Sequence, residues 1–109
     1  MYCAIALSVP VAAQSPKIGC TFQGKGTFLR DRCSFSNSGA LSRFIPKSTT
    51  LDWNDGVRTQ IEFLTIESLH MGAAEGTATI DGEPATFKTF SDGGKCITVV
   101  KSGNSVCYR

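Results

Sequence analysis

The residues of this sequence best suited to covalent chemistry are Cys20, Cys33, Cys96 and Cys107. An even set of cysteines in a short exported chain is typical of a disulfide framework rather than of separate reactive thiols. Cys96 and Cys107 lie nearly symmetrically about residues 101–103, so a hairpin there would bring their Cα atoms within disulfide range. The spacing predicts the pairs 96–107 and, by elimination, 20–33, while two other connectivities stay open.

His70 is the single histidine and the only other candidate for catalysis. As a general base it would need a nucleophile such as Ser68 and an acid from elsewhere. Residues two apart on a strand share a face without meeting as nucleophile and base. We therefore predict no catalytic residue, and a hydrolase using His70 stays as an alternative. Because the four cysteines are expected to form disulfides and the chain has one histidine, it lacks the usual zinc ligands. No metal or cofactor is predicted.

The first fourteen residues carry no charge, and their apolar run ends in Val11-Ala12-Ala13. This pattern is typical of a secretory signal, although no Lys or Arg precedes the run. Either the start lies upstream of Met1 or the segment is a first strand over residues 5–11. We expect a signal segment at 1–14, a single β domain at 15–109, and a secreted or periplasmic location. No other segment reaches the roughly 18 apolar residues of a membrane span.

The mature part is rich in Thr, Ser, Gly, Val, Ile and Phe, with turn signals about every ten residues. These features favour an all-β antiparallel barrel or sandwich of about eight short strands. The clearest hairpin joins 50–53 to 57–63 through Asn54-Asp55-Gly56. The other expected strands are 18–22, 27–35 (with a fold-back around 30–32 as an option), 76–80, 85–90, 95–100 and 105–109. Residues 36–42 are expected to be loop.

Alternation in the long arm after Gly56 is lost at Leu64. We expect there either a bulge or the start of a short helix over 67–71, ended by Gly72. The aromatic residues in strand-like runs are expected in the core: Phe22, Phe28, Phe35, Trp53, Phe63, Phe87 and Phe90. Whether they leave an internal ligand cavity is open from sequence.

Charge is distributed unevenly: residues 17–47 hold six basic residues against Asp31, whereas residues 48–109 hold five basic and eight acidic ones. Such asymmetry can mark a face for an anionic partner, or the two segments can pair across strands. Within the basic segment, the loop 37–47 carries Phe44, either as a contact tip or as a plug for the barrel end. The predicted binding residues are Arg30, Arg32, Arg43, Phe44 and Lys47.

Together these features predict a small exported, non-catalytic binding protein that recognises an anionic surface or a secreted or envelope protein. A secreted inhibitor that inserts a loop into an extracellular hydrolase is the alternative within binding. Nucleic acid is not an expected partner, because the basic residues show no pattern of stacking aromatics.

Overall fold

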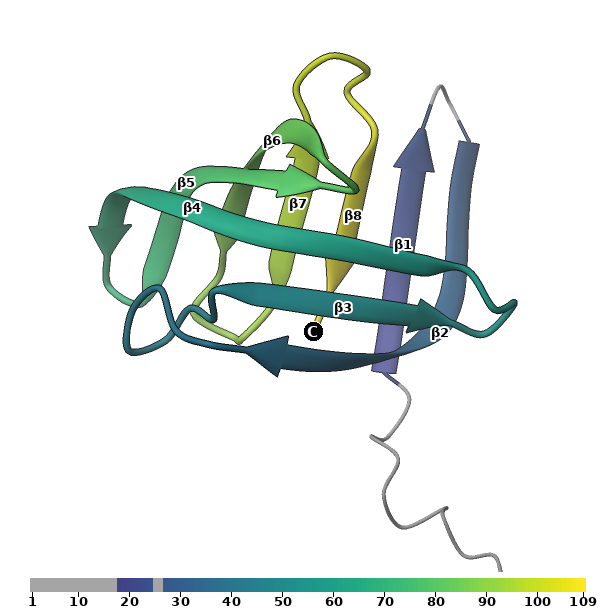
Figure 1. Cartoon of the computed structure of the whole chain (residues 1–109), viewed down its shortest axis with the longest axis horizontal. Coiled ribbons are helices and arrows are strands. Elements are labelled where there is room, and N and C mark those ends of the chain that lie inside the picture. Colours follow the sequence, from purple (N-terminus) through teal and green to yellow (C-terminus); the bar gives the residue numbers. More distant parts are fainter. Residues whose placement is uncertain (1–17, 25–26) are drawn as a thin grey trace, which may run out of the picture.

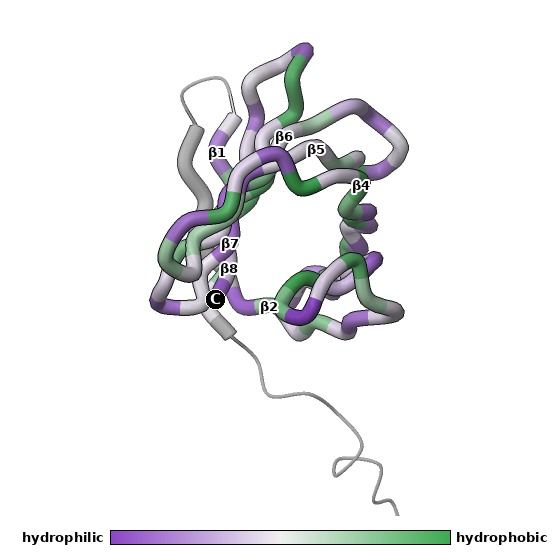
Figure 2. The backbone as a smooth tube through the Cα atoms, turned by 90° about the vertical axis from the view of Figure 1, so that its left-hand side faces the viewer, coloured by the Kyte–Doolittle hydropathy of each residue, from purple (hydrophilic) through white to green (hydrophobic). Residues whose placement is uncertain are grey.

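The chain folds as a meander in which each strand pairs with its sequence neighbour and the last strand returns to the first (Figure 1). The computed structural model describes residues 18–24 and 27–109. Its strands are β1 (Ile18–Gly24), β2 (Thr27–Ser38), β3 (Ser48–Trp53), β4 (Arg58–His70), β5 (Ala73–Ile80), β6 (Glu83–Thr89), β7 (Lys95–Val99) and β8 (Ser105–Tyr108). Antiparallel pairing of β1 with β8 closes the barrel, and Figure 2 shows the resulting ring. The predicted all-β architecture is confirmed.

Period-two alternation decides which side chains fill the barrel, because successive residues of a strand point to opposite faces. In β4 the side chains of Thr59, Ile61 and Phe63 are buried, and the residues between them are exposed. Phe63 meets Phe87 of β6 edge-to-face, with ring centroids 5.1 Å apart. This pair forms the centre of the apolar core, which also contains Leu51 and Ile97.

The strand β4 continues past Leu64 to His70, so the alternative of a helix over 67–71 is wrong. The predicted irregularity is a bulge: the β4–β5 register shifts between Phe63 and Thr65, and again between Ile66 and Ser68. On both sides of the bulges, pairing with β5 satisfies backbone groups that a helix would otherwise have satisfied internally.

Gly76 of β5 lies where the bulged β4 approaches most closely. A Cβ at this position would overlap the backbone carbonyl oxygen of Thr65 and would lie 2.7 Å from the ring of Phe87. A glycine inside a strand often marks such a close approach of another backbone. The bend in β4 therefore depends on the missing side chain of Gly76.

β2 is longer than expected. It runs without a fold-back through residues 30–32 and pairs with β1 and then with β3 as far as Ser38. The loop predicted at 36–42 therefore begins only at Gly39. Polar residues 36–38 remain in strand conformation because the partner residues 48–50 of β3 complete their ladder.

Both predicted disulfides are present, and they lie on opposite sides of the barrel wall. Cys20–Cys33 links β1 to β2 in the interior, where both residues are buried. Cys96 and Cys107 are directly paired across β7 and β8, with Cα atoms 4.1 Å apart, on the outer face. Their neighbours Ile97 and Val106 point inward. Two disulfides suggest an oxidising environment, such as the extracellular space or the periplasm.

Most of the expected core aromatics pack as predicted, with Phe63 and Phe87 buried and Phe22, Phe35 and Trp53 packed against the core. Phe90 is the exception: it follows β6 in the turn to β7 and is 46% exposed. The Phe28 side chain and the signal segment at 1–14 lie outside the described residues. Within the described ranges, no helix is long and apolar enough to cross a membrane.

Candidate functional site

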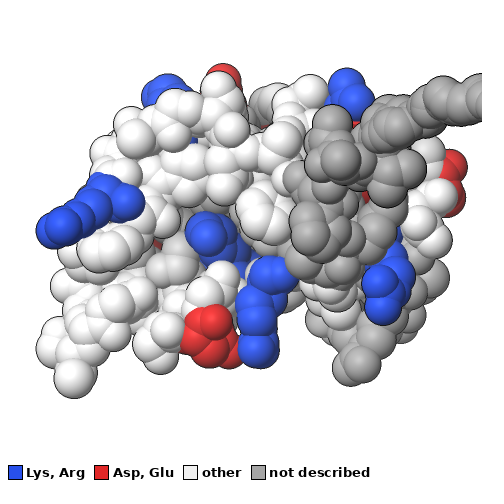
Figure 3. Space-filling view, turned by 90° about the horizontal axis from the view of Figure 1, so that it is seen from below, with Lys and Arg blue, Asp and Glu red and all other residues white. Residues whose placement is uncertain are grey.

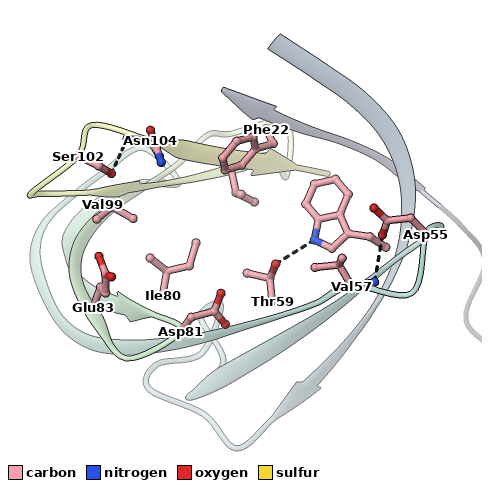
Figure 4. Close-up of a pocket in the computed structure, with 12 residues that line it drawn as sticks. Phe22, Asp55, Val57, Thr59, Ile80, Asp81, Glu83, Val99, Ser102 and Asn104 are labelled. Carbon is pink, nitrogen blue, oxygen red and sulfur yellow. Dashed lines mark hydrogen bonds between the residues drawn. The ribbon is translucent and has the colours of Figure 1, made fainter. Parts of the chain in front are cut away.

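One end of the barrel opens into a cavity of about 620 Å³, which we call the mouth cup. The hairpins β3–β4, β5–β6 and β7–β8 turn at this end, and Figure 4 shows side chains from their strands converging around the space. The described lining residues are Phe22, Trp53, Asp55, Val57, Thr59, Ile80, Asp81, Glu83, Val99, Ser102, Asn104 and Val106. The large side chains Phe22 and Trp53 lie in the wall of the cup, and the other apolar lining residues are the smaller Val57, Ile80, Val99 and Val106.

Trp53 is fixed in the cup wall by the hairpin that carries it. Its backbone N–H donates to the Val57 carbonyl at 2.8 Å, and Gly56, with φ of +93°, donates back to the Trp53 carbonyl. The indole Nε1–H donates to the Thr59 hydroxyl at 2.9 Å (Figure 4). Because each polar group of this pair satisfies the other, the wall presents the apolar indole ring to the cavity.

The rim of the cup is acidic. Asp55, Asp81 and Glu83 line it, and the described lining includes no Lys or Arg. Asp55 accepts a hydrogen bond from the Val57 backbone at 3.0 Å and Asp81 one from the Gln60 backbone at 2.9 Å, which fixes both carboxylates at the turns. Three acidic side chains with no basic one among the described lining residues oppose an anionic ligand.

The opposite end is closed by the loop between β2 and β3. The Ile45 carbonyl accepts from the backbone N–H groups of Leu41 and Ser42 at 2.8 and 3.0 Å, and the Ser42 hydroxyl accepts from the backbones of Phe44 and Ile45. These bonds fold the loop tightly and direct Ile45 into the core. Ile45, rather than Phe44, is therefore the plug, and Phe44 is 76% exposed.

The predicted binding residues do not gather into one described surface. Arg32 is exposed at the middle of β2, six residues before the strand ends, or about 20 Å at strand rise. Arg43, Phe44 and Lys47 belong to the closing loop, and Arg43 lies over the Phe44 ring at 5.9 Å. The Arg30 side chain lies outside the described part. In Figure 3 the basic side chains are spread over the lower face rather than gathered in one patch, and near its middle two of them lie beside an acidic one.

His70 is exposed at the end of β4, where its partner is Ala73. Ser68 is exposed two residues earlier on the same strand. In the described part of the chain, no side-chain hydrogen bond joins His70 to a serine or a carboxylate, as the hydrolase alternative would require. In the same part, no group of three His, Cys, Asp or Glu side chains is placed to hold a metal ion.

Sequence reasoning missed the mouth cup and also missed Lys95, which points inward near the closed end. The inward position of Lys95 could have been predicted from alternation in β7, since Lys95 shares a face of the strand with the apolar residues Ile97 and Val99. The cup residues come from seven strands and the turns between them, and only ring closure shows that they face one space.

Tyr108 is buried between β1 and β7, and its ring packs 6.2 Å from that of Phe35. Burial raises the pKa of Tyr108 to about 12, while the neighbouring Thr49 hydroxyl, which lies outside hydrogen-bond geometry, lowers it by a smaller amount. A phenolate at this position would be desolvated, so the folded state strongly favours the neutral phenol.

We expect the free energy of unfolding to fall by up to about 3 kcal/mol as pH rises from 10 to 12. The unfolded chain releases the phenolic proton near pH 10, whereas the folded chain retains it until about pH 12. Guanidinium unfolding at stepped pH measures this loss, and Tyr108→Phe should remove it. Desolvation lowers the pKa of Lys95, and this shift makes the free energy of unfolding rise with pH, opposite to the effect of Tyr108. If the Tyr108→Phe variant shows the same loss as the wild type, the assignment to Tyr108 is wrong.

Comparison of the chain with protein-family models, with curated proteins and with solved structures finds no match. Function is therefore inferred from the residues of the chain itself.

Proposed function

We propose that this protein is a non-catalytic binding protein that holds one small, apolar-bodied ligand in the mouth cup. The observation that carries the proposal is the cavity itself, with its wall of Phe22, Trp53, Ile80, Val99 and Val106. Small-molecule sites have volumes of about 300–1,000 Å³ and occur in the mouths of β-barrels. Eight-stranded barrels are just wide enough to hold one small ligand.

The polar groups around the apolar wall favour a neutral or cationic ligand. The three rim carboxylates, Asp55, Asp81 and Glu83, would repel an anion, and the buried amide oxygen of Asn104 has no hydrogen-bond partner in the described structure. The anionic partner expected from the basic residues would therefore have to bind elsewhere on the barrel. Two disulfides suit the proposed release of this carrier into an oxidising compartment.

Filling the cup should weaken binding of a neutral apolar probe. Trp53 is the only tryptophan of the chain and lines the cup, so its fluorescence reports occupancy directly. We expect the uncharged dye N-phenyl-1-naphthylamine to bind saturably and to change Trp53 emission. Val99→Phe should weaken that binding about tenfold or more, because the larger ring occupies ligand space.

Val100→Phe is the matched control, since Val100 is the next residue and is 64% exposed outside the cup. It should leave both affinity and emission unchanged. Circular dichroism of each variant checks that the barrel is folded. Absence of saturable binding to the wild-type protein, or equal affinity in the Val99→Phe variant, would overturn the proposed function.

A further inference from the structure

The closed end of the barrel carries a second hollow, of about 370 Å³, which we call the loop groove. Three connections meet around it: the loop between β2 and β3, the turn between β4 and β5, and the turn between β6 and β7, which gather at the lower left of Figure 1. Its described lining is Ser42, Phe44, Ile45, Ile66, Leu69, Gly72, Ala74, Thr89, Phe90, Ser91, Gly93 and Lys95.

The groove is apolar, and its walls are open to solvent. Phe44 is 76% exposed, Leu69 64% and Phe90 46%, although each lies against the hollow. Single exposed apolar residues need no explanation, but three from separate parts of the chain (the β2–β3 loop, the end of β4 and the β6–β7 turn) around one hollow mark a contact site. The floor, formed by Ile45 and Ala74, is buried.

Lys95 is the one charged side chain in the described lining of the loop groove. It is half-buried, and its ammonium lies 6.0 Å over the ring of Tyr108. In the described part of the chain no carboxylate comes within ion-pair distance of Lys95. Asp92 pairs instead with Arg109 at 3.0 Å. A half-buried cation without a counter-ion is costly, and a ring face compensates only partly.

Desolvation lowers the pKa of Lys95, in agreement with an ammonium that has lost water without gaining an anion. A carboxylate bound in the groove would supply that missing counter-ion. An apolar body attached to it would cover Phe44, Leu69 and Phe90.

We propose that the loop groove binds an amphipathic carboxylate, with its anionic head on Lys95 and its apolar body between Phe44, Leu69 and Phe90. This chemistry is shared by a medium-chain fatty acid and by the apolar C-terminal residue of a peptide. The site is distinct from the mouth cup, which lies at the other end of the barrel and has an acidic rim.

Calorimetric titration with octanoate and 1-octanol tests the head-group contact, and each variant carries Val99→Phe so that the neutral alcohol cannot occupy the mouth cup. We expect octanoate to bind more tightly than octanol, and Lys95→Gln to weaken octanoate about tenfold or more while leaving octanol unchanged. Lys88→Gln is the matched control, because Lys88 is an exposed lysine on the adjacent strand outside the groove. It removes the same net charge and should change neither affinity.

Leu69→Asn tests the apolar body through an exposed residue whose replacement leaves the core intact. It should weaken octanoate and octanol alike. A peptide ending in leucine, with a free or an amidated C-terminus, distinguishes a peptide source from a fatty acid. Val99→Phe separates the two sites, since a filled mouth cup should not affect octanoate.

Three results would overturn the proposal. They are equal affinity for octanoate and octanol, equal effects of Lys95→Gln and Lys88→Gln, and loss of octanoate binding in the Val99→Phe variant. The last would place the carboxylate in the mouth cup, which would still be a ligand site but without the expected preference for neutral or cationic ligands.

Discussion

The substitution Gly76→Ala is expected to destabilise the barrel by about 3 kcal/mol or more. The added methyl group would overlap the carbonyl oxygen of Thr65, which belongs to the backbone of β4 and cannot rotate away. Phe87, on the other side, is packed in the core against Phe63. Relief therefore requires β4 and β5 to separate where the bulges bend them. Guanidinium unfolding followed by circular dichroism measures the loss.

Gly19→Ala is the matched control for this prediction. Gly19 also lies in a strand, but nothing is within 4 Å of the position a Cβ would take, and its φ is not positive. Its replacement should be neutral, or should stabilise by up to about 1 kcal/mol through the unfolded chain. Similar effects of the two substitutions would show that the close approach at Gly76 is not tight.

Removing the interior disulfide by the double substitution Cys20→Ala and Cys33→Ala is expected to cost more than about 3 kcal/mol. Loop closure alone accounts for about that amount, and deletion of two buried sulfur atoms adds a packing loss. A small domain has only about 5–15 kcal/mol of net stability, so this variant should be largely unfolded in mild denaturant. The free energy of unfolding in urea gives the result.

The outer disulfide provides the comparison, because its sequence separation of 11 is close to the 13 of the interior one. Cys96→Ala with Cys107→Ala should therefore lose a similar loop-closure contribution but less packing. In native buffer with dithiothreitol, the half-buried 96–107 bond should be reduced first. Equal losses in the two double variants, or simultaneous reduction, would contradict a difference based on burial.

The parts of the fold that could be predicted are those decided by neighbouring residues. Asn54-Asp55-Gly56 predicts its hairpin because few residues other than glycine accept the positive φ found at Gly56. The 96–107 disulfide could be predicted because the two cysteines lie symmetrically about a turn. In the resulting hairpin they are directly opposite each other. Both depend on contacts between segments close in sequence.

The errors arise where distant pairing overrides local preference. Residues 67–71 have the composition of a helical turn, but β5 pairs with residues 68–70 and keeps β4 extended. Residues 30–32 are polar, as in a turn, yet they pair with β1 as an ordinary strand segment. Phe90 has the apolar character of a core residue, but it falls one residue after β6 ends.

The two sites were the least predictable features, because the residues of each come together only when the barrel closes. Trp53, Ile80 and Val99 belong to strands separated in sequence and meet only around the ring. The predicted basic residues were chosen from local charge density, which carries no information on distance between them. Lys95 was detectable by its inward parity, whereas the absence of a carboxylate beside it, among the residues that the structure describes, depends on the tertiary structure.

The pairing of β1 with β8 is the one step of the meander that joins distant parts of the chain. Every other strand pair is a hairpin between sequence neighbours, so only the β1–β8 pair carries the entropy cost of closing a long loop. Cys20–Cys33 ties β1 to β2, and Cys96–Cys107 ties β7 to β8. Each of the two strands that form the seam is therefore covalently linked to its other neighbour. Disulfide formation holds both hairpins in place before β1 pairs with β8 and closes the barrel.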